Sequence, residues 1–213
     1  MKFYNLLQLG GPLMFVLLAV SIFALLIVVA KIIQFRNEGV FRLFADDIFI
    51  ETLRAKNITD CREMLNGEVT CKPLVRTVKV ALEYCEQGSN SSSQIYSEIQ
   101  RIGSREVRNL ETLLRELSAI AYVSPLIGLL GTVIGMIAAF SELQSAGTQI
   151  SPALLAGGIW EALLTTAFGL CIAIVSLTAF YYFEGVIDSL QSRINDVITQ
   201  VLIHYNVSKT DLA

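Results

Sequence analysis

The chain has 213 residues, of which 54% are hydrophobic and only 16% are charged, and its mean hydropathy is +0.58. This composition is too apolar for an ordinary soluble domain, and not apolar enough for a chain that lies in lipid throughout. The formal net charge of -3 is small and gives no indication of nucleic-acid binding.

Three apolar stretches are long enough to cross a membrane. No charged residue lies between Phe3 and Ala30, so we predict a first span within residues 1–34. A second span is predicted at 117–141, and a third at 153–183 contains one charged residue, Glu161. About 20 apolar residues in a helix cover the hydrocarbon core of a bilayer. The predicted fold class is an all-α membrane protein with three transmembrane helices and long helical cytoplasmic extensions.

The distribution of Lys and Arg predicts the orientation of these spans. Thirteen of the sixteen basic residues lie between Lys31 and Glu116, whereas the loop at 142–152 has none. The positive-inside rule therefore places a domain at 35–116 and a tail at 184–213 in the cytoplasm. The N-terminus and the short loop are expected on the outer side.

Little in the sequence indicates an enzyme or a metal site. There is no C-x-x-C pair and only one histidine, so no metal ion or other cofactor is predicted. We also find no arrangement of nucleophile and base and no phosphate-binding glycine loop.

The segments outside the spans show helical patterns. The apolar residues between Phe41 and Leu53 have an approximate helical spacing, and Pro73–Cys85 is predicted as a second helix. From Gln94 the spacing is strongly helical up to Leu117, which predicts an amphipathic helix that runs into the second span without a break. The tail repeats this pattern from Val186 to Tyr205. The apolar stripes could pack within the chain or against neighbouring copies, and the sequence favours neither.

The second and third spans carry regularly spaced small residues. Such residues let helix backbones approach closely in lipid, where the hydrophobic effect does not drive association. In the second span they form one face with Ser124 and Ala139 at its ends, and in the third they recur every four residues around Glu161. The predicted helix-packing positions are Gly128, Gly131, Gly135, Gly157 and Gly169.

Glu161 and nearby threonines form the candidate functional site. A charged side chain at the centre of a membrane helix costs about 2.5–3.5 kcal/mol on insertion scales, so Glu161 should face a bundle interior or a water-filled cavity. The hydroxyls of Thr132, Thr165 and Thr166 could line a path for protons together with this carboxylate. In the alternative interpretation, Glu161 lies near the outer interface and the threonines bond to carbonyls of their own helices. The residues alone leave both open.

Two segments resemble a known family. GLLGTVIGM in the second span and GGIWEALLTTAFGLCIAI in the third are similar to the MotA/TolQ/ExbB proton-channel family, especially its ExbB and TolQ branches. The resemblance implies a homopentamer whose second and third helices surround a pore, with an ExbD- or TolR-type single-span partner inside it. By motif, Thr132, Glu161 and Thr166 match the family's pore residues, whereas Thr165 stands where the motif more often has alanine.

The resemblance also implies a function and a location. We expect a channel-forming subunit of a motor driven by the proton-motive force in the bacterial inner membrane, with the N-terminus periplasmic and the C-terminus cytoplasmic. No aspartate lies in any span, and in the family the partner's membrane helix supplies one. An ExbB-like role, in which a TonB-type protein is energised for outer-membrane import, is favoured. The alternatives are a TolQ-like subunit that acts on a TolA-type protein, and a membrane scaffold that conducts nothing.

Overall fold

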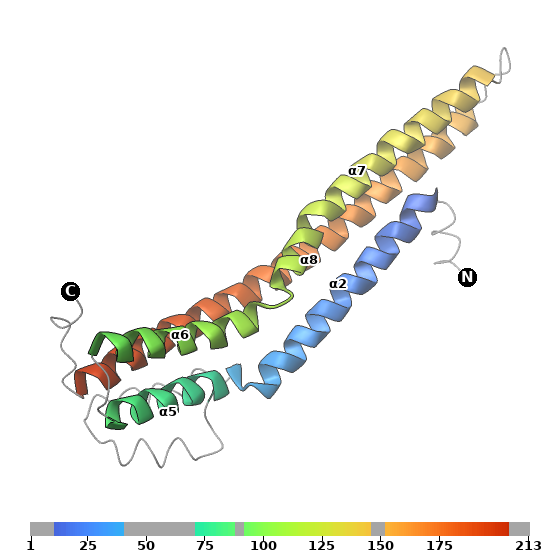
Figure 1. The fold of residues 1–213 in the computed structure, drawn as a ribbon. Helices are drawn as coiled ribbons and strands as arrows, with labels where there is room; N and C mark the ends of the chain where they lie inside the picture. The colour runs from blue at the N-terminus through green and yellow to red at the C-terminus, as the bar shows by residue number, and fades with distance from the viewer. Residues whose placement is uncertain (1–10, 41–70, 88–91, 146–151, 205–213) are drawn as a thin grey trace. The chain divides into compact units, whose positions relative to one another are not determined.

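The computed structural model describes residues 11–40, 71–87, 92–145 and 152–204, and every regular element in these ranges is a helix. Figure 1 shows them in chain order as α2 (Gly11–Asn37), α5 (Lys72–Gln87), α6 (Ser92–Glu111), α7 (Leu114–Ser145) and α8 (Pro152–His204). Three of these helices, α2, α7 and α8, are long and apolar enough to cross a membrane. The predicted all-α fold with three spans is therefore confirmed, whereas the pattern expected at residues 41–53 lies outside the described residues.

The chain divides into two compact units. We call residues 1–30 with 113–182 the membrane unit, and residues 31–112 with 183–213 the polar unit. The helices α2 and α8 contribute one part to each unit. The predicted spans at 117–141 and 153–183 fall inside α7 and α8, both of which are longer than the predicted spans. The membrane boundaries themselves, and the sides on which the termini lie, stay predictions.

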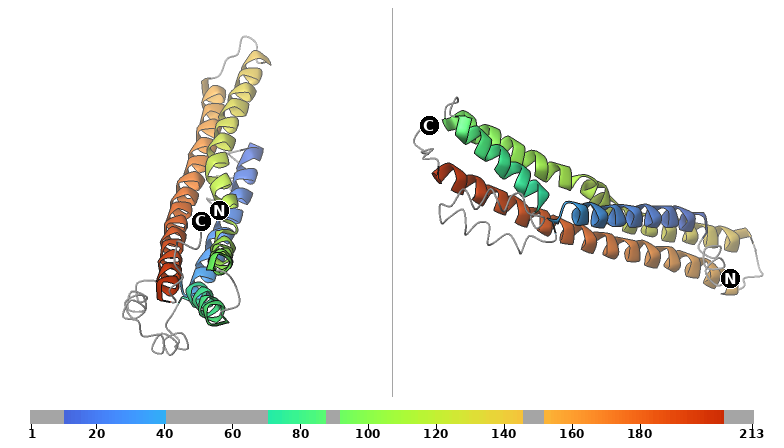
Figure 2. Two further views of the ribbon diagram at one scale, coloured as in Figure 1. Left: turned by 60° about the vertical axis from the view of Figure 1, so that its left-hand side comes forward. Right: turned by 90° about the horizontal axis from the view of Figure 1, so that it is seen from below.

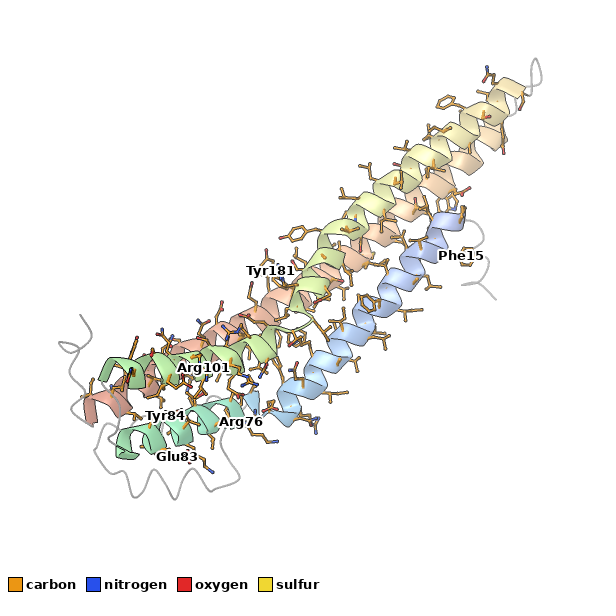
Figure 3. The ribbon with its side chains drawn as sticks, in the orientation of Figure 1. Phe15, Arg76, Glu83, Tyr84, Arg101 and Tyr181 are labelled. Carbon is orange, nitrogen blue, oxygen red and sulfur yellow. The ribbon has the colours of Figure 1, made fainter. Side chains whose placement is uncertain are left out.

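In the membrane unit, α7 packs along α8 through small side chains (Figure 1). The buried face of α7 from Ala121 to Ala139 consists only of alanine, serine and glycine. Large apolar side chains point outward instead, and Phe15 of α2, for example, is 53% exposed (Figure 3). This arrangement inverts that of a soluble bundle, and it suits helices surrounded by lipid or by other membrane helices.

In the polar unit, the core lies between α5, α6 and the last part of α8, which run side by side in the views of Figure 2. Gly103 of α6 permits close contact, because a Cβ atom there would lie 2.9 Å from Ile194 Cγ2 and 3.6 Å from Thr77 Cγ2. Phe35 at the end of α2 makes an edge-to-face contact with Phe183, with ring centroids 5.2 Å apart. The sequence left open whether the apolar stripes of α6 and of the last part of α8 pack within the chain or against other copies. In the structure they pack against one another within one chain. The fully buried side chains of this core are Leu74, Ile99, Leu110, Leu190 and Ile194.

Arg76 of α5 connects the polar unit's helices at its surface (Figure 3). Its guanidinium donates a hydrogen bond of 3.0 Å to Glu106 of α6 and lies 3.4 Å from Glu38 Oε2. Partial burial lowers the pKa of Arg76, but the hydrogen bond to Glu106 and the two carboxylate charges raise it above its ordinary value. Because these groups are partly exposed, we expect the ion pairs to orient α5 rather than to contribute much stability.

The amphipathic helix does not continue into the second span, so that prediction is wrong. Helix α6 ends at Glu111 and α7 begins at Leu114, with Leu113 between them in the left-handed conformation at φ 67°. The end of α6 is capped from α2, where Lys31 Nζ donates to Leu110 O at 2.6 Å and Gln34 Nε2 donates to Asn109 O at 3.1 Å. These bonds satisfy carbonyls that a helix end leaves without partners. In contrast, α8 continues unbroken from the third span into the tail, as predicted.

Candidate functional site

The contact between α7 and α8 leaves no room for larger residues at its glycines. A Cβ atom at Gly128 would lie 3.0 Å from Thr165 O and from Thr166 Cα, and one at Gly131 would lie 2.7 Å from Thr165 Cβ. On the opposite helix, a Cβ at Gly169 would lie 2.6 Å from Ser124 O. Real Cβ atoms essentially never approach other atoms more closely than 3.0 Å. Gly131 and Gly169 therefore set how closely the two helices approach.

Near the end of α7 and the start of α8, the contact involves a different glycine of α8 from the one expected. Gly135 faces Ala162, with a Cβ distance of 3.1 Å, and a Cβ at Gly158 would lie 2.5 Å from Ala139 Cβ. Gly157 is exposed, and no described atom lies within 4 Å of a Cβ placed there. Among the described residues, Gly158 therefore makes the contact with α7, and a packing role for Gly157 stays a prediction.

The adjacent threonines of α8 have different environments. Thr165 is 2% exposed, and its hydroxyl donates to Ala162 O of its own helix at 2.8 Å, with Gly128 O at 3.5 Å. Thr166 is half-buried, and its hydroxyl donates across to Gly128 O at 3.0 Å. Thr165 is thus held inside the contact, whereas Thr166 lies at its edge and keeps part of its surface accessible.

Thr132 lies on another part of α7. Its hydroxyl donates to Leu129 O of the same helix at 2.7 Å, and the side chain is half-buried. It lines a groove of about 590 Å³ along the outward face of α7, together with Met136, Phe140 and Gln144. Local bonding of this kind was the alternative interpretation of the threonines, and it describes the bonds of Thr132 and Thr165 but not that of Thr166.

Glu161 is half-buried and lies against the first turn of α2. A Cβ atom at Gly11 would lie 3.2 Å from Glu161 Cδ, and closer still to Oε1. In the described part of the chain, no hydrogen bond or ion pair joins Glu161 to Thr132, Thr165 or Thr166. The structure thus brings Thr165 and Thr166 together at Gly128, and places Thr132 and Glu161 in separate surroundings of the same unit.

Three residues that the sequence did not single out emerge from this geometry. Gly158 replaces Gly157 in the helix contact, Gly11 lies against Glu161, and Lys31 caps α6. A sequence signal existed only for Gly11, because a glycine followed by a proline is typical of a helix start. Among the residues that the structure describes, no group of His, Cys, Asp or Glu side chains could hold a metal ion.

Comparison with known proteins identifies the family. Residues 67–196 match the model of the MotA/TolQ/ExbB proton channel family. An ExbB homolog of biopolymer transport from Methanothermobacter thermautotrophicus is 36% identical over 52% of this chain and 38% of its own length. The Tol-Pal system protein TolQ of Haemophilus influenzae is 44% identical over 36% of this chain and 33% of its own length.

A third relative is similar over most of the chain. The ExbB-like biopolymer transport protein 1 of Synechocystis is 31% identical over 90% of this chain and 73% of its own length. This chain spans less than half the length of each of the first two relatives, whereas it covers about three quarters of the third. The chain belongs to the MotA/TolQ/ExbB proton channel family.

Proposed function

We propose that this chain is the channel-forming subunit of a membrane motor driven by proton flow, and that it assembles around a single-span partner. The observation that carries the proposal is the position of Thr166, whose hydroxyl bonds across to Gly128 O and yet stays partly accessible at the edge of the contact. A tightly packed pair of helices with one such hydroxyl at its edge can form part of a pore wall. Membership of a proton channel family supports this interpretation.

The structure suggests different roles for the four predicted site residues. Thr166 and Thr132 have accessible surface and would line the path. Thr165 would hold the helices together, because its hydroxyl is buried and bonded. Glu161 is the one charged residue in the predicted spans at 117–141 and 153–183, and we assign it to the entrance of the path.

A partner carboxylate would complete the mechanism. The predicted spans at 1–34, 117–141 and 153–183 contain no aspartate, so the group that is alternately protonated and deprotonated would come from an ExbD- or TolR-type helix inside a homopentamer. Proton flow past Thr166 would neutralise and recharge that carboxylate. The inner helix would then turn and transmit work to a TonB-type protein.

Relatives of two systems support two versions of this function. ExbB proteins and TolQ proteins are both similar to this chain. We favour the ExbB-like role in outer-membrane import over the TolQ-like role in the Tol–Pal system. Complementation of bacteria that lack one or the other subunit, with the cognate single-span partner supplied, separates the two roles.

Proton flux tests the proposal directly. Liposomes that contain the chain with its single-span partner should take up protons under an imposed gradient, and Glu161→Ala and Thr166→Val should reduce this flux. Thr178→Val is the matched control, because Thr178 lies on the same helix, is exposed and bonds only to Ile174 O of that helix. Equal flux in all samples, or flux no higher than in empty liposomes, would favour the non-conducting scaffold.

A further inference from the structure

The first turn of α2 has an unusual feature at Gly11. This residue begins the helix with a positive φ of 64°, a conformation that costs other residues about 1–2 kcal/mol. The side of Gly11 on which a Cβ would stand is occupied by the carboxyl group of Glu161. The backbone conformation at position 11 therefore disfavours a side chain, and a Cβ atom there would push aside the flexible end of Glu161.

The place where the carboxylate lies is chemically favourable. The first N–H groups of a helix have no partner within the helix, and the aligned peptide dipoles make this end partly positive. This end of α2 therefore offers a favourable potential to a carboxylate without a basic side chain, although no hydrogen bond joins Glu161 to α2 among the described residues. Glu161 needs such a site, because a charged group within a membrane helix is otherwise expensive.

We infer that Gly11 is a positioning residue for Glu161: the glycine leaves open the space at the start of α2 that the carboxyl group of Glu161 occupies. This inference rests on the proposed function, since it assigns to the first membrane helix a role in placing a group of the proton path. Gly11 itself takes no part in proton transfer. The first span then does more than anchor the chain in the bilayer.

The geometry predicts that residues 11 and 161 complement one another in size. Gly11→Ala adds a methyl group where the carboxylate lies and should displace it. Glu161→Asp shortens the side chain by one methylene group and should make room for that methyl. The double variant should therefore conduct better than Gly11→Ala alone, which a purely structural defect at position 11 does not predict.

Proton flux in liposomes with the single-span partner tests this complementation. We expect Gly11→Ala to lower the flux about tenfold or more, since small displacements of a reacting group are costly. Adding Glu161→Asp should restore flux to the level of Glu161→Asp alone. The matched control is Gly39→Ala, because Gly39 also has a positive φ, 72°, but lies at the other end of α2. Any loss that it causes should not be relieved by Glu161→Asp. Absence of rescue for Gly11→Ala, or equal rescue for both glycine variants, would overturn the inference.

A second measurement tests the contact without any transport assay. In a full-length chain whose four natural cysteines are replaced by serine, Gly11→Cys with Glu161→Cys should be joined by a short thiol-specific cross-linker. Gly11→Cys with Leu163→Cys should not, because Leu163 is 60% exposed on another side of α8. Mass spectrometry of the digested protein identifies the linked peptides. Cross-links only between chains, or equal linkage of both pairs, would refute the contact. If the unaltered chain conducts no protons, the proposed function fails, and the cross-link still decides whether Gly11 and Glu161 meet.

Discussion

Glycines in the membrane unit differ in which atoms a Cβ placed on them would meet. At Gly131 and Gly169 the space for this atom contains atoms of the opposite helix, whereas at Gly157 it is open within the described chain. The first two are therefore needed for the approach of α7 to α8. Gly157 is free to contact lipid or another chain.

This difference predicts unequal effects of adding one methyl group. Gly131→Ala would bring its Cβ to 2.7 Å from Thr165 Cβ, and such overpacking typically costs about 1–3 kcal/mol. We expect the thermal unfolding midpoint of the detergent-solubilised protein to fall for Gly131→Ala. Gly157→Ala serves as the comparison. In a chain separated from other copies, it should leave the thermal unfolding midpoint unchanged. An unaltered midpoint for Gly131→Ala would contradict the observed packing.

The two neighbouring threonines should respond differently to the loss of their hydroxyls. Thr165→Val removes a buried hydroxyl that bonds mainly to its own helix, and valine fills nearly the same volume. We therefore expect proton flux to change by no more than about threefold, which corresponds to the low end of a hydrogen bond's net contribution. Thr166→Val removes the accessible hydroxyl and should reduce flux much more. Flux measurements on the two variants in parallel decide this, and a larger loss at Thr165 would reverse the assigned roles.

The sequence predicted the small-residue face of α7 fully but that of α8 only in part. Ser124, Gly128, Gly131 and Gly135 are all buried, as expected. In the third span the prediction followed a strict repeat of four residues, which drifts by about 40° per step because a helix has 3.6 residues per turn. Positions 165 and 169 of this repeat therefore face α7. Gly157, two steps earlier, has rotated away from the contact. How the two faces would meet could not be read from either helix alone.

At the scale of elements, α6 and α7 are separated at Thr112 and Leu113. Leu113 has a positive φ of 67°, although leucine is neither a glycine nor an asparagine and gives no signal of a helix end. Periodicity continues through this position, so the sequence predicted one long helix. The buried polar cap of Lys31 and Gln34 involves α2, about 75 residues earlier in the chain, and such contacts are invisible in local patterns.

The cap predicts that Lys31 protects the end of α6. The side chain of Lys31 is fully buried, and it donates to Leu110 O and to Gln34 Oε1. Lys31→Met keeps most of the volume and removes the donor, which we expect to cost about 1–3 kcal/mol. Hydrogen exchange measured by mass spectrometry should become faster in the last turn of α6.

Lys79→Met provides the matched control for this experiment. Lys79 lies on α5 and is exposed, so the same substitution there should not change exchange at the end of α6. If Lys31→Met leaves exchange in residues 107–113 at the level of the unaltered protein, the lysine does not stabilise the break between α6 and α7.

At the scale of the whole molecule, the described residues leave most of the apolar surface of the membrane helices uncovered. Only 22–28% of the most apolar window of each helix is buried. Lipid can cover such a surface, but a pore requires several copies of the chain around a common axis. The number of copies was implied by family resemblance alone, because neither composition nor periodicity records how many chains meet.

This exposure predicts an assembly larger than one chain. The protein has a mass of 23.4 kDa, and extraction in a mild detergent should give complexes of five chains by native mass spectrometry. Charge repulsion is not expected to prevent this assembly, since the predicted spans at 117–141 and 153–183 contain one charged residue, Glu161. A single-chain mass at all protein concentrations would exclude a pore made from these helices.

The orientation of the chain gives a final prediction, because the positive-inside rule predicts on which side of the membrane each end of α8 lies. Ser145 ends α7 next to the loop without basic residues, whereas Ser192 lies in the part of α8 predicted to be cytoplasmic, and both are exposed. In a chain without its natural cysteines, Ser145→Cys should react in intact cells with a maleimide that enters the periplasm but does not cross the inner membrane. Ser192→Cys should react only after that membrane is opened. Labelling of Ser192→Cys alone in intact cells would show that the orientation is opposite to the predicted one. Gly11 and Glu161 would then lie on the cytoplasmic side of the proton path.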